Sequence, residues 1–352
     1  MAEARTSTGR HLRVSFHLAA PPASSFLYYD YDCHGNDDLI KVVAAHGDSI
    51  LLMVKHGHSN ASSMVTYDHF VYRQWNIPKH YEGEMANQED YWTLTACRVL
   101  LEEDTGVLRR GEEDLIVAQL EMMPTDDSGG SDVADICVLR LGMSQWVPII
   151  LHGEDNDLIE KYQHMAIAVG DRFLGWVCYH RGLIVCDMAG EARSPNPKLQ
   201  YVPLPVLPYD PSNYTDDLPP LTHTKNVGAA GSSVVWFVNI EPRCCCGGFG
   251  RSVCARSQFA FTVTTWTLTL TMDEPMKWVK DSVLGCEELW ALPGYEGLPR
   301  VHLECPIMSL DIPDIVCFKV LHYNNLEGRK MWMIQVDTRS KELLSVVEYT
   351  AR

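Results

Sequence analysis

Short extended runs recur along this 352-residue sequence, and they constrain its fold more than any other feature. An alternating stretch near the start places Val14, Phe16 and Leu18 on one face of a strand. Two further apolar runs, residues 49–54 and 64–72, flank a turn-rich segment and predict a hairpin. Convincing long helical periods are missing, so we predict an all-β protein.

Two more groups of strands are predicted downstream. Residues 173–179, 183–188 and 199–202 are apolar runs separated by turn residues, which predicts a three-strand meander. Residues 331–336 and 343–349 flank a polar turn and predict a hairpin at the carboxyl end.

The alternation of apolar residues shifts by one position at Thr264 and Thr265, between Val263 and Trp266. A one-residue shift moves the buried side chains to the other face of a strand unless the strand is bulged or broken. We therefore predict a bulge or a corner at this pair of threonines.

Helical signals are few. Leu158, Ile159, Tyr162 and Met165 have helical spacing behind an acidic start, which predicts a short helix. Residues 286–290 predict a single helical turn.

Many short strands grouped into meanders suggest a sandwich, a barrel or a propeller, and we favour a propeller-like arrangement of short antiparallel meanders, regular or irregular. Residues 1–10 are predicted to be a flexible amino terminus, and residues 11–352 to form a single β-propeller-like domain. A Pro-rich stretch, residues 203–220, is the one plausible internal boundary, but the strands on both sides look alike. If a ring closes through one shared blade, residues 13–18 would lie beside residues 343–349.

The charge of the chain narrows the class of partner. Its 46 acidic and 29 basic residues give a formal net charge of -17. Such a charge repels nucleic acids and anionic membranes, so we predict neither as a partner. The acidic charge can be interpreted as serving a basic partner or as serving ordinary colloidal solubility, and we favour solubility.

Two features of the sequence bear on the cellular compartment: the hydrophobicity of its first residues and the distribution of its cysteines. Residues 1–13 lack the apolar core of a signal peptide, and no apolar run reaches the ~18 residues that span a bilayer. The twelve cysteines are scattered, which indicates reduced thiols that are mostly small buried hydrophobes. We expect an intracellular protein, cytoplasmic, nuclear or both.

A cluster of cysteines is the most unusual local composition. Cys244, Cys245 and Cys246 precede a glycine-rich segment that is followed by Cys254. Four thiolates can hold zinc, but three adjacent cysteines cannot easily point at one ion. We favour a glycine-rich loop with reduced thiols, with zinc binding and redox chemistry as alternatives.

Several histidines raise the question of a metal site. His56 and His58 are close in sequence to His46, His69 and His80. Because the first two fall in a predicted turn, we favour ordinary histidines over ligands. No metal-binding residue and no cofactor-binding residue is predicted.

No catalytic residue is predicted either. The sequence lacks the Gly-x-Ser-x-Gly elbow of a hydrolase, and Gly231-Ser232-Ser233 precedes a strand without that pattern. It also lacks a phosphate-binding loop. Carboxylates at 102–104 and 112–114 are interpreted as solvated residues beside turns.

Tryptophans occur in several of the predicted strands. At an interface such residues could anchor a partner, whereas within a large β core they fill space between sheets. We favour the core for Trp176, Trp266 and Trp332.

Several stretches of the sequence resemble one known family, the plant family defined by domain of unknown function number 1618, which is abundant in grasses. The stretches occur in the expected order over almost the whole chain and comprise residues 8–16, 105–112, 174–177 with 184–187, 201–205, and 332–337 ahead of Glu348 and Tyr349.

The resemblance implies a strand organisation similar to the propeller-like domains associated with F-box proteins. It brings no established reaction, cofactor or catalytic residue, so no functional residue is carried over. This chain lacks the preceding segment of the longer family pattern, so the first strand or blade is expected to be incomplete or closed differently. No F-box-like helical segment is found ahead of Arg13.

The leading functional hypothesis is a protein-recognition scaffold that uses loops on a β-propeller-like domain, with an unidentified protein as its partner. One alternative is a hydrolase-type enzyme with a site in a central cavity. Another is an F-box-related ubiquitin-ligase adaptor that lacks its F-box. An enzyme is the less favoured class.

Overall fold

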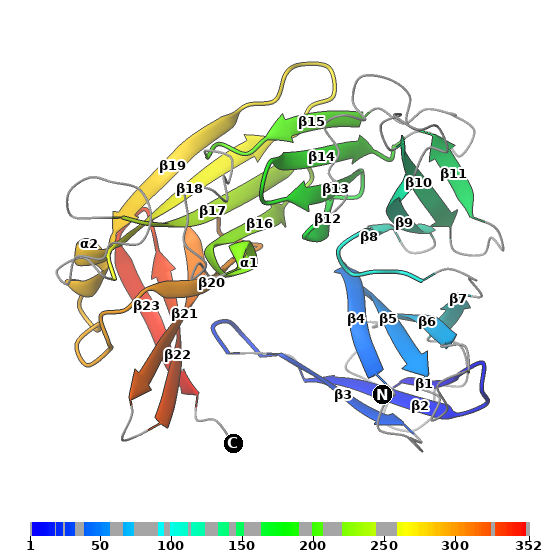
Figure 1. Ribbon diagram of the computed structural model, residues 1–352, viewed down its shortest axis with the longest axis horizontal. Helices are drawn as coiled ribbons and strands as arrows, with labels where there is room; N and C mark the ends of the chain where they lie inside the picture. Colours follow the sequence, from blue (N-terminus) through cyan, green and yellow to red (C-terminus); the bar gives the residue numbers. More distant parts are fainter. Residues whose placement is uncertain are drawn as a thin grey trace. The chain divides into compact units, whose positions relative to one another are not determined.

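The computed structural model consists almost entirely of β-strands arranged in open antiparallel sheets (Figure 1). The residues that it describes are 2–17, 19–23, 25–31, 39–56, 66–73, 91–94, 99–111, 114–123, 133–140, 146–150, 163–189, 199–206, 220–243, 259–324 and 328–349. In each sheet the strands follow one another in chain order, as consecutive hairpins require.

The first three sheets come from the amino-terminal half of the chain. The first sheet contains β1 (Ala2–Arg5), β2 (His11–His17) and β3 (Phe26–Tyr31). The second contains β4 (Leu39–His46), β5 (Ser49–His56), β6 (Thr66–Arg73) and β7 (Tyr91–Leu94). The third contains β8 (Thr105–Arg110), β9 (Asp114–Met123), β10 (Val133–Arg140) and β11 (Val147–Ile150).

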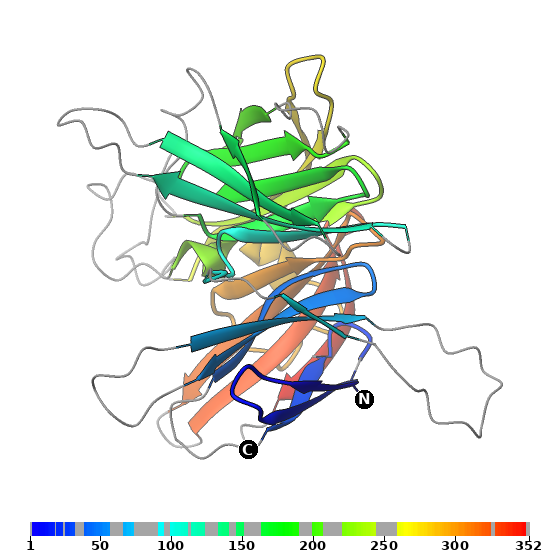
Figure 2. The ribbon, with the colours of Figure 1, turned by 90° about the vertical axis from the view of Figure 1, so that its right-hand side faces the viewer.

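The other three sheets have four strands each. The fourth contains β12 (Met165–Val169), β13 (Phe173–Cys178), β14 (Gly182–Asp187) and β15 (Leu199–Pro203). The fifth contains β16 (Lys225–Ala230), β17 (Val234–Pro242), β18 (Phe261–Thr269) and β19 (Trp278–Gly285). The sixth contains β20 (Leu303–Met308), β21 (Ile315–Asn324), β22 (Gly328–Asp337) and β23 (Glu342–Tyr349), coloured orange to red in Figure 2.

Two short helices complete the described elements. They are α1 (Leu221–Thr224) and α2 (Cys286–Trp290). In the described part of the chain, neither has the length or the apolar character that crossing a membrane requires.

The all-β prediction is confirmed, and so is the organisation into short antiparallel meanders. The three predicted hairpins or meanders correspond to β5 with β6, β13 to β15, and β22 with β23. The predicted helical turn at 286–290 is α2.

The chain divides into two compact units, and the division passes through the fourth sheet. Unit 1 comprises Met1–Leu18, Ser25–Trp176 and Cys186–Lys198, and unit 2 comprises Ala19–Ser24, Val177–Val185 and Leu199–Arg352. The single domain over residues 11–352 stays a prediction.

In unit 1, the second sheet is buried on both faces, and β5 shows how the sequence achieves this. Leu51 and Met53 pack with residues of the third sheet, whereas Leu52 and Val54 pack with residues of the first sheet. Successive side chains of a strand point to opposite faces, so a strand covered on both sides must be apolar without alternation. This explains the continuous apolar run from residue 50 to residue 54.

In unit 2, the main core lies between the fifth and sixth sheets. Ile240 and Val263 of the fifth sheet belong to the same buried cluster as Phe318 and Ile334 of the sixth sheet. The opposite face of the fifth sheet is apolar too, because Phe237 stacks on Trp266 with ring centroids 5.2 Å apart.

An irregularity is present at the predicted position, but the bulge lies in the neighbouring strand β19, so the predicted bulge in β18 itself is wrong. The register of β18 against β19 shifts between Thr265 and Trp266, while its register against β17 is continuous. Thr265 lies opposite Ser282 and Trp266 lies opposite Lys280, so the extra residue is Asp281 of β19. The apolar residues before and after the shift point to opposite faces of β18, and both faces are buried.

The tryptophan predictions are confirmed for two residues. Trp176 and Trp266 are buried, with 0% and 6% of their surface exposed. Trp332 is partly buried and packs against the unit 2 core.

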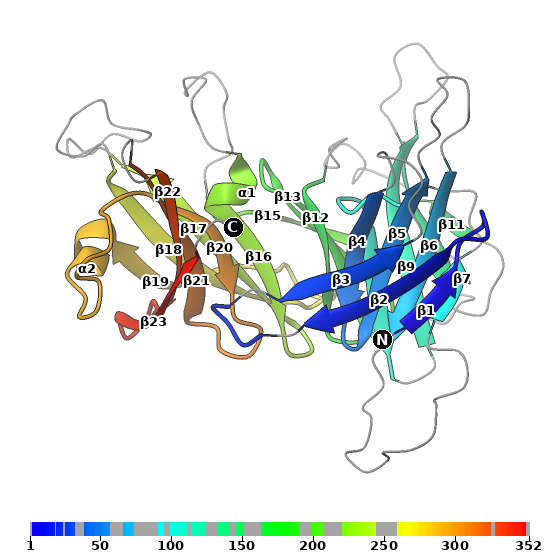
Figure 3. The ribbon, with the colours of Figure 1, turned by 90° about the horizontal axis from the view of Figure 1, so that it is seen from below.

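The beginning of the chain differs from its prediction. Residues 2–5, predicted to be flexible, form β1, which pairs with β2 (Figure 3). The side chain of Ala4 in this strand is buried. The apolar side chain of Ala4 joins the cluster around Leu12 and Val14, and this burial holds the strand. The first sheet has three described strands, whereas each of the others has four.

The proposed pairing of the first and last strands is wrong. Both edges of β2 are occupied, by β1 and β3, whereas β23 pairs with β22 in the sixth sheet. No backbone edge of β2 is left for a closing strand.

The predicted helix near residue 160 is wrong at its end, because Met165 begins strand β12. Leu158, Ile159 and Tyr162 lie outside the described residues, as does most of the Pro-rich stretch 203–220.

Candidate functional site

The histidines weighed as possible metal ligands belong to no group of metal-ligating side chains among the described residues. The backbone N–H of Arg109 donates to Nδ1 of His46 at 2.9 Å, and burial lowers the pKa of His46. His69 is fully buried at the centre of β6. His58 and His80 lie outside the described residues.

His56 belongs to a buried polar network instead. It is the last residue of β5, so the predicted turn at this position is wrong. Its Nε2 lies 2.6 Å from Oδ2 of Asp68, and its Nδ1 lies 2.8 Å from the hydroxyl of Tyr31. Both the N–H and the hydroxyl of Ser7 donate to the same carboxylate oxygen. The network ties the first sheet to the second, and such fully paired buried groups favour one packing arrangement.

The predicted cysteine-rich loop, Cys244 to Cys246 with Cys254, lies outside the described residues. All but one of the cysteines among the described residues are buried, as predicted. The exception is Cys305, which is partly exposed.

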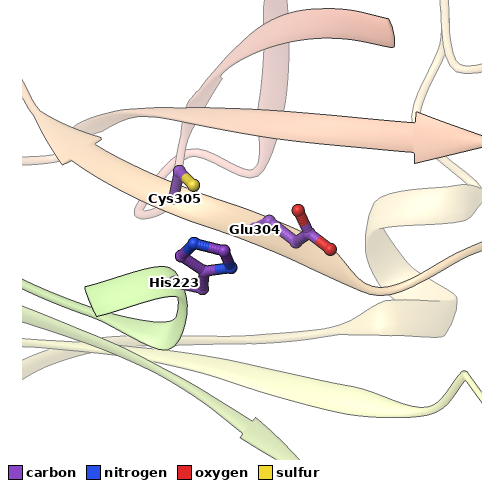
Figure 4. Close-up of side chains that lie close together, drawn as sticks. All are labelled: His223, Glu304 and Cys305. Atoms are coloured by element: carbon purple, nitrogen blue, oxygen red, sulfur yellow. The ribbon is translucent and has the colours of Figure 1, made fainter. Parts of the chain in front are cut away.

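Cys305 lies in a group of three residues with metal-ligating side chains. Its thiol, the carboxylate of Glu304 and the imidazole of His223 have ligand atoms within 4.8 Å of one another. Figure 4 shows the three side chains gathered between α1, which carries His223, and β20, which carries the other two. All three residues are partly buried.

A bulge in β20 brings the two neighbouring side chains together. Glu304 lies opposite Lys319 of β21, and the next described pair is Ile307 with Cys317. Two residues of β20 therefore lie opposite one residue of β21, which is the pattern of a bulge. Cys305 has a left-handed backbone with φ of 49°, a conformation that costs a non-glycine residue free energy.

A lysine, Lys319, lies beside the group and adds a positive charge to it. Its ammonium donates to Oε2 of Glu304 at 3.0 Å, and both side chains are mostly buried. Burial raises the pKa of the Cys305 thiol; the charge of Lys319 opposes this rise, and the charge of Glu304 adds to it.

The end of β20 and the loop that follows it display apolar side chains. Leu310 is 68% exposed, more than any other large apolar residue that the structure describes, and Ile307 and Ile312 are 54% and 49% exposed. We refer to residues 307–312, which comprise the last two residues of β20 and the loop after it, as the 307–312 loop.

Hydrogen bonds hold the 307–312 loop in place. The hydroxyl of Ser309 accepts from the N–H groups of Asp311 and Ile312, and the N–H of Ser309 donates to the carbonyl of Ile315. Just beyond the loop, the carbonyl of Asp314 accepts from Thr338. The apolar side chains are thus displayed on an ordered backbone.

Other buried or partly buried ionisable groups have perturbed pKa values. Burial is the first cause in each case: it raises the pKa of Asp104 to about 6, lowers that of His69 to about 4 and lowers that of Lys225 to about 8. The Lys225 ammonium donates to the carbonyl of Tyr179 at 3.0 Å. These shifts come mainly from the apolar interior and not from a paired acid and base.

Sequence reasoning missed both the metal-ligating group and the apolar residues of the 307–312 loop. One signal was available, because Pro306 interrupts an otherwise strand-like run, and proline inside a strand indicates an edge or a bulge. His223 gave no signal of its own.

The sheets define an all-β protein built from short antiparallel meanders. Within this class, the family described as "Protein of unknown function (DUF1618)" matches residues 176–317, which confirms the resemblance drawn from the sequence. The match covers the fourth sheet from Trp176 onward, the fifth sheet, and the group of His223, Glu304 and Cys305.

Comparisons with other proteins add little to the family match. No curated protein matches the sequence. The WD40 domain of SCAP from fission yeast is 13% identical, with 100% of this chain and 76% of that chain covered and a TM-score of 0.38. An alpha-L-arabinofuranosidase from Podospora anserina, in complex with cellotriose, is 9% identical, with 89% and 90% covered and a TM-score of 0.28. Likenesses this weak carry no argument about function.

Proposed function

We propose that the protein is a recognition scaffold that binds a protein partner through the 307–312 loop. The observation that carries the proposal is the exposure of Leu310, Ile307 and Ile312 within six residues of an ordered loop. Single exposed apolar residues are ordinary, but several of them close together on a protein surface are typical of interaction sites.

The order of the loop is what makes it suited to binding. Association costs free energy for every loop that must be ordered, so a loop already held by hydrogen bonds keeps more of its contact energy as affinity. The side chain of Asp314 also accepts a hydrogen bond from Arg339, which attaches the base of the loop to the turn between β22 and β23. Rigid scaffolds commonly present their binding residues in this way.

The chemistry of the partner follows from the loop and from the net charge. Two exposed aliphatic side chains, Leu310 and Ile312, require an apolar groove. Asp311 is exposed between them, and the whole chain has a formal net charge of -17. We therefore expect the groove of the partner to be rimmed by basic residues, whose charge would speed association.

The test compares three forms of the tagged protein by affinity purification and quantitative mass spectrometry. The first is the wild type, the second is the double variant Leu310→Ser with Ile312→Ser, and the third is Val279→Ser, which removes an apolar residue of β19 that is 62% exposed. A partner kept by the wild type and by Val279→Ser, and lost by the double variant, supports the proposal.

A purified partner then allows a quantitative check. Burial of one aliphatic side chain contributes roughly 1.5–3 kcal/mol, so the double variant should bind at least about tenfold more weakly. Equal affinities for the wild type and the double variant would overturn the role of the loop. Recovery of a ubiquitin-ligase subunit that binds both forms equally would favour the adaptor alternative instead.

A further inference from the structure

Neighbouring residues of a regular strand point to opposite faces of the sheet, so Glu304 and Cys305 would normally be directed apart. The bulge in β20 changes this, because Cys305 takes a left-handed backbone and the ligand atoms of both residues lie within 4.8 Å of His223. Bulges that redirect a side chain are frequent beside functional sites. The strained conformation thus has a specific result, which is the convergence of three side chains.

We propose that His223, Glu304 and Cys305 bind a divalent metal ion of the zinc type. The proposal is independent of the recognition function proposed above, because it rests on other side chains and on another measurement.

The donor set favours zinc over the harder cations. Imidazole nitrogen, carboxylate oxygen and thiolate sulfur are the three ligand types that zinc takes in proteins. A thiolate makes calcium and magnesium poor occupants, since both prefer oxygen ligands. Three protein ligands leave a fourth tetrahedral position for water or for a group from a bound molecule.

Lys319 suits the role of a residue that positions a ligand. It holds Oε2 of Glu304 at 3.0 Å, which leaves Oε1 of the same carboxylate to face an ion. Partners of this kind orient the ligating group, and their loss typically lowers metal affinity by about 10- to 100-fold.

The test must separate this group from the cysteine-rich loop, whose thiols could also bind zinc. We therefore start from a variant in which Cys244, Cys245, Cys246 and Cys254 are all replaced by serine. The protein is treated with a chelator, cobalt(II) is added as a spectroscopic probe, and zinc is then titrated in competition. The expected result is one cobalt per chain, with a thiolate-to-cobalt charge-transfer band that zinc removes.

Further variants in this background assign the ligands. Cys305→Ser should abolish the charge-transfer band, His223→Gln should weaken binding and alter the band, and Lys319→Met should weaken binding by about 10- to 100-fold. Cys317→Ser is the matched control, because this buried thiol lies on the adjacent strand and opposite Ile307. It should leave the band unchanged.

Two results would overturn the proposal. One is a failure of the four-serine variant to bind cobalt or zinc while its circular dichroism matches the wild type. The other is a charge-transfer band that persists in Cys305→Ser with the same affinity. His223→Gln changes a residue of α1 and keeps a polar side chain of similar length. Weaker binding by this variant therefore cannot be attributed to misfolding of β20.

Discussion

A buried lysine makes the stability of unit 2 depend on pH in a way that can be worked out in advance. Lys225 begins β16 and is 7% exposed. Its ammonium donates to the carbonyl of Tyr179, and burial lowers its pKa from 10.5 to about 8 against the opposing charge of Glu241. The folded protein therefore holds this proton less tightly than the unfolded chain does.

The sign and the size of the effect follow from proton linkage. Between pH 10.5 and about 8, the unfolded chain binds the proton and the folded protein does not, so the free energy of unfolding falls as the pH falls. Below pH 8 both states are protonated, and the burial of the charged amine then lowers the free energy of unfolding by its full amount of ~3 kcal/mol. Between pH 7 and pH 9.5 the wild type should regain about 2 kcal/mol of this cost.

The assay is urea unfolding of the wild type and of Lys225→Met at pH 7 and pH 9.5, followed by tryptophan fluorescence. The difference between the two proteins isolates the titration of this one amine. The wild type should gain about 2 kcal/mol relative to Lys225→Met as the pH rises. Lys277→Met, which removes an exposed lysine, controls for the loss of one charge. A difference between wild type and Lys225→Met that stays constant over this range would refute the reasoning.

Three other predictions concern packing and buried polar groups. Gly182→Ala should lower the free energy of unfolding by ~1–3 kcal/mol in urea denaturation, because its Cβ would lie 2.6 Å from the ring of Tyr201 and from a backbone carbonyl oxygen; an unchanged midpoint would contradict the close approach. His69 has a pKa of about 4, below its ordinary 6.5, so its burial destabilises the fold as the pH falls through this range; relative to His69→Leu, the wild type should lose about 2 kcal/mol between pH 7.5 and pH 5, and parallel pH profiles would argue against it. Tyr31→Phe removes one hydrogen-bond partner of His56, and Asp68→Asn removes the charge of the other partner. A double-mutant cycle of unfolding free energies should therefore give a coupling above about 0.5 kcal/mol, whereas additive effects would count against a shared network.

Strands are easiest to predict from the sequence where neighbouring sheets bury one or both of their faces along the whole strand. The continuous apolar run at residues 49–54 reflects burial on two faces of the strand. The alternation around Val14 reflects burial on one face. β4 was missed, and its register against β5 shifts between Val42 and Ala44, which breaks the alternation that would have identified it. A bulge can therefore hide a strand from its local pattern, as it does for β4.

The functional groups were harder to predict than the strands because they depend on contacts between distant segments. His223 is about eighty residues from Glu304 and Cys305, and only the packing of α1 beside β20 brings them together. His56 was assigned to a turn because a glycine follows it. Its place in a strand is fixed by Asp68 and Tyr31, which local sequence does not reveal.

The bulge in β20 also affects how copies of the protein behave toward one another. β20 is an edge strand of the sixth sheet, and a regular edge offers unpaired N–H and C=O groups to any other strand, which is a route to aggregation. Pro306 has no N–H to offer, and the extra residue beside it breaks the spacing that an added strand would need. The feature that gathers His223, Glu304 and Cys305 therefore also protects this edge from intermolecular β-pairing, and restoring a regular strand there would expose the protein to it.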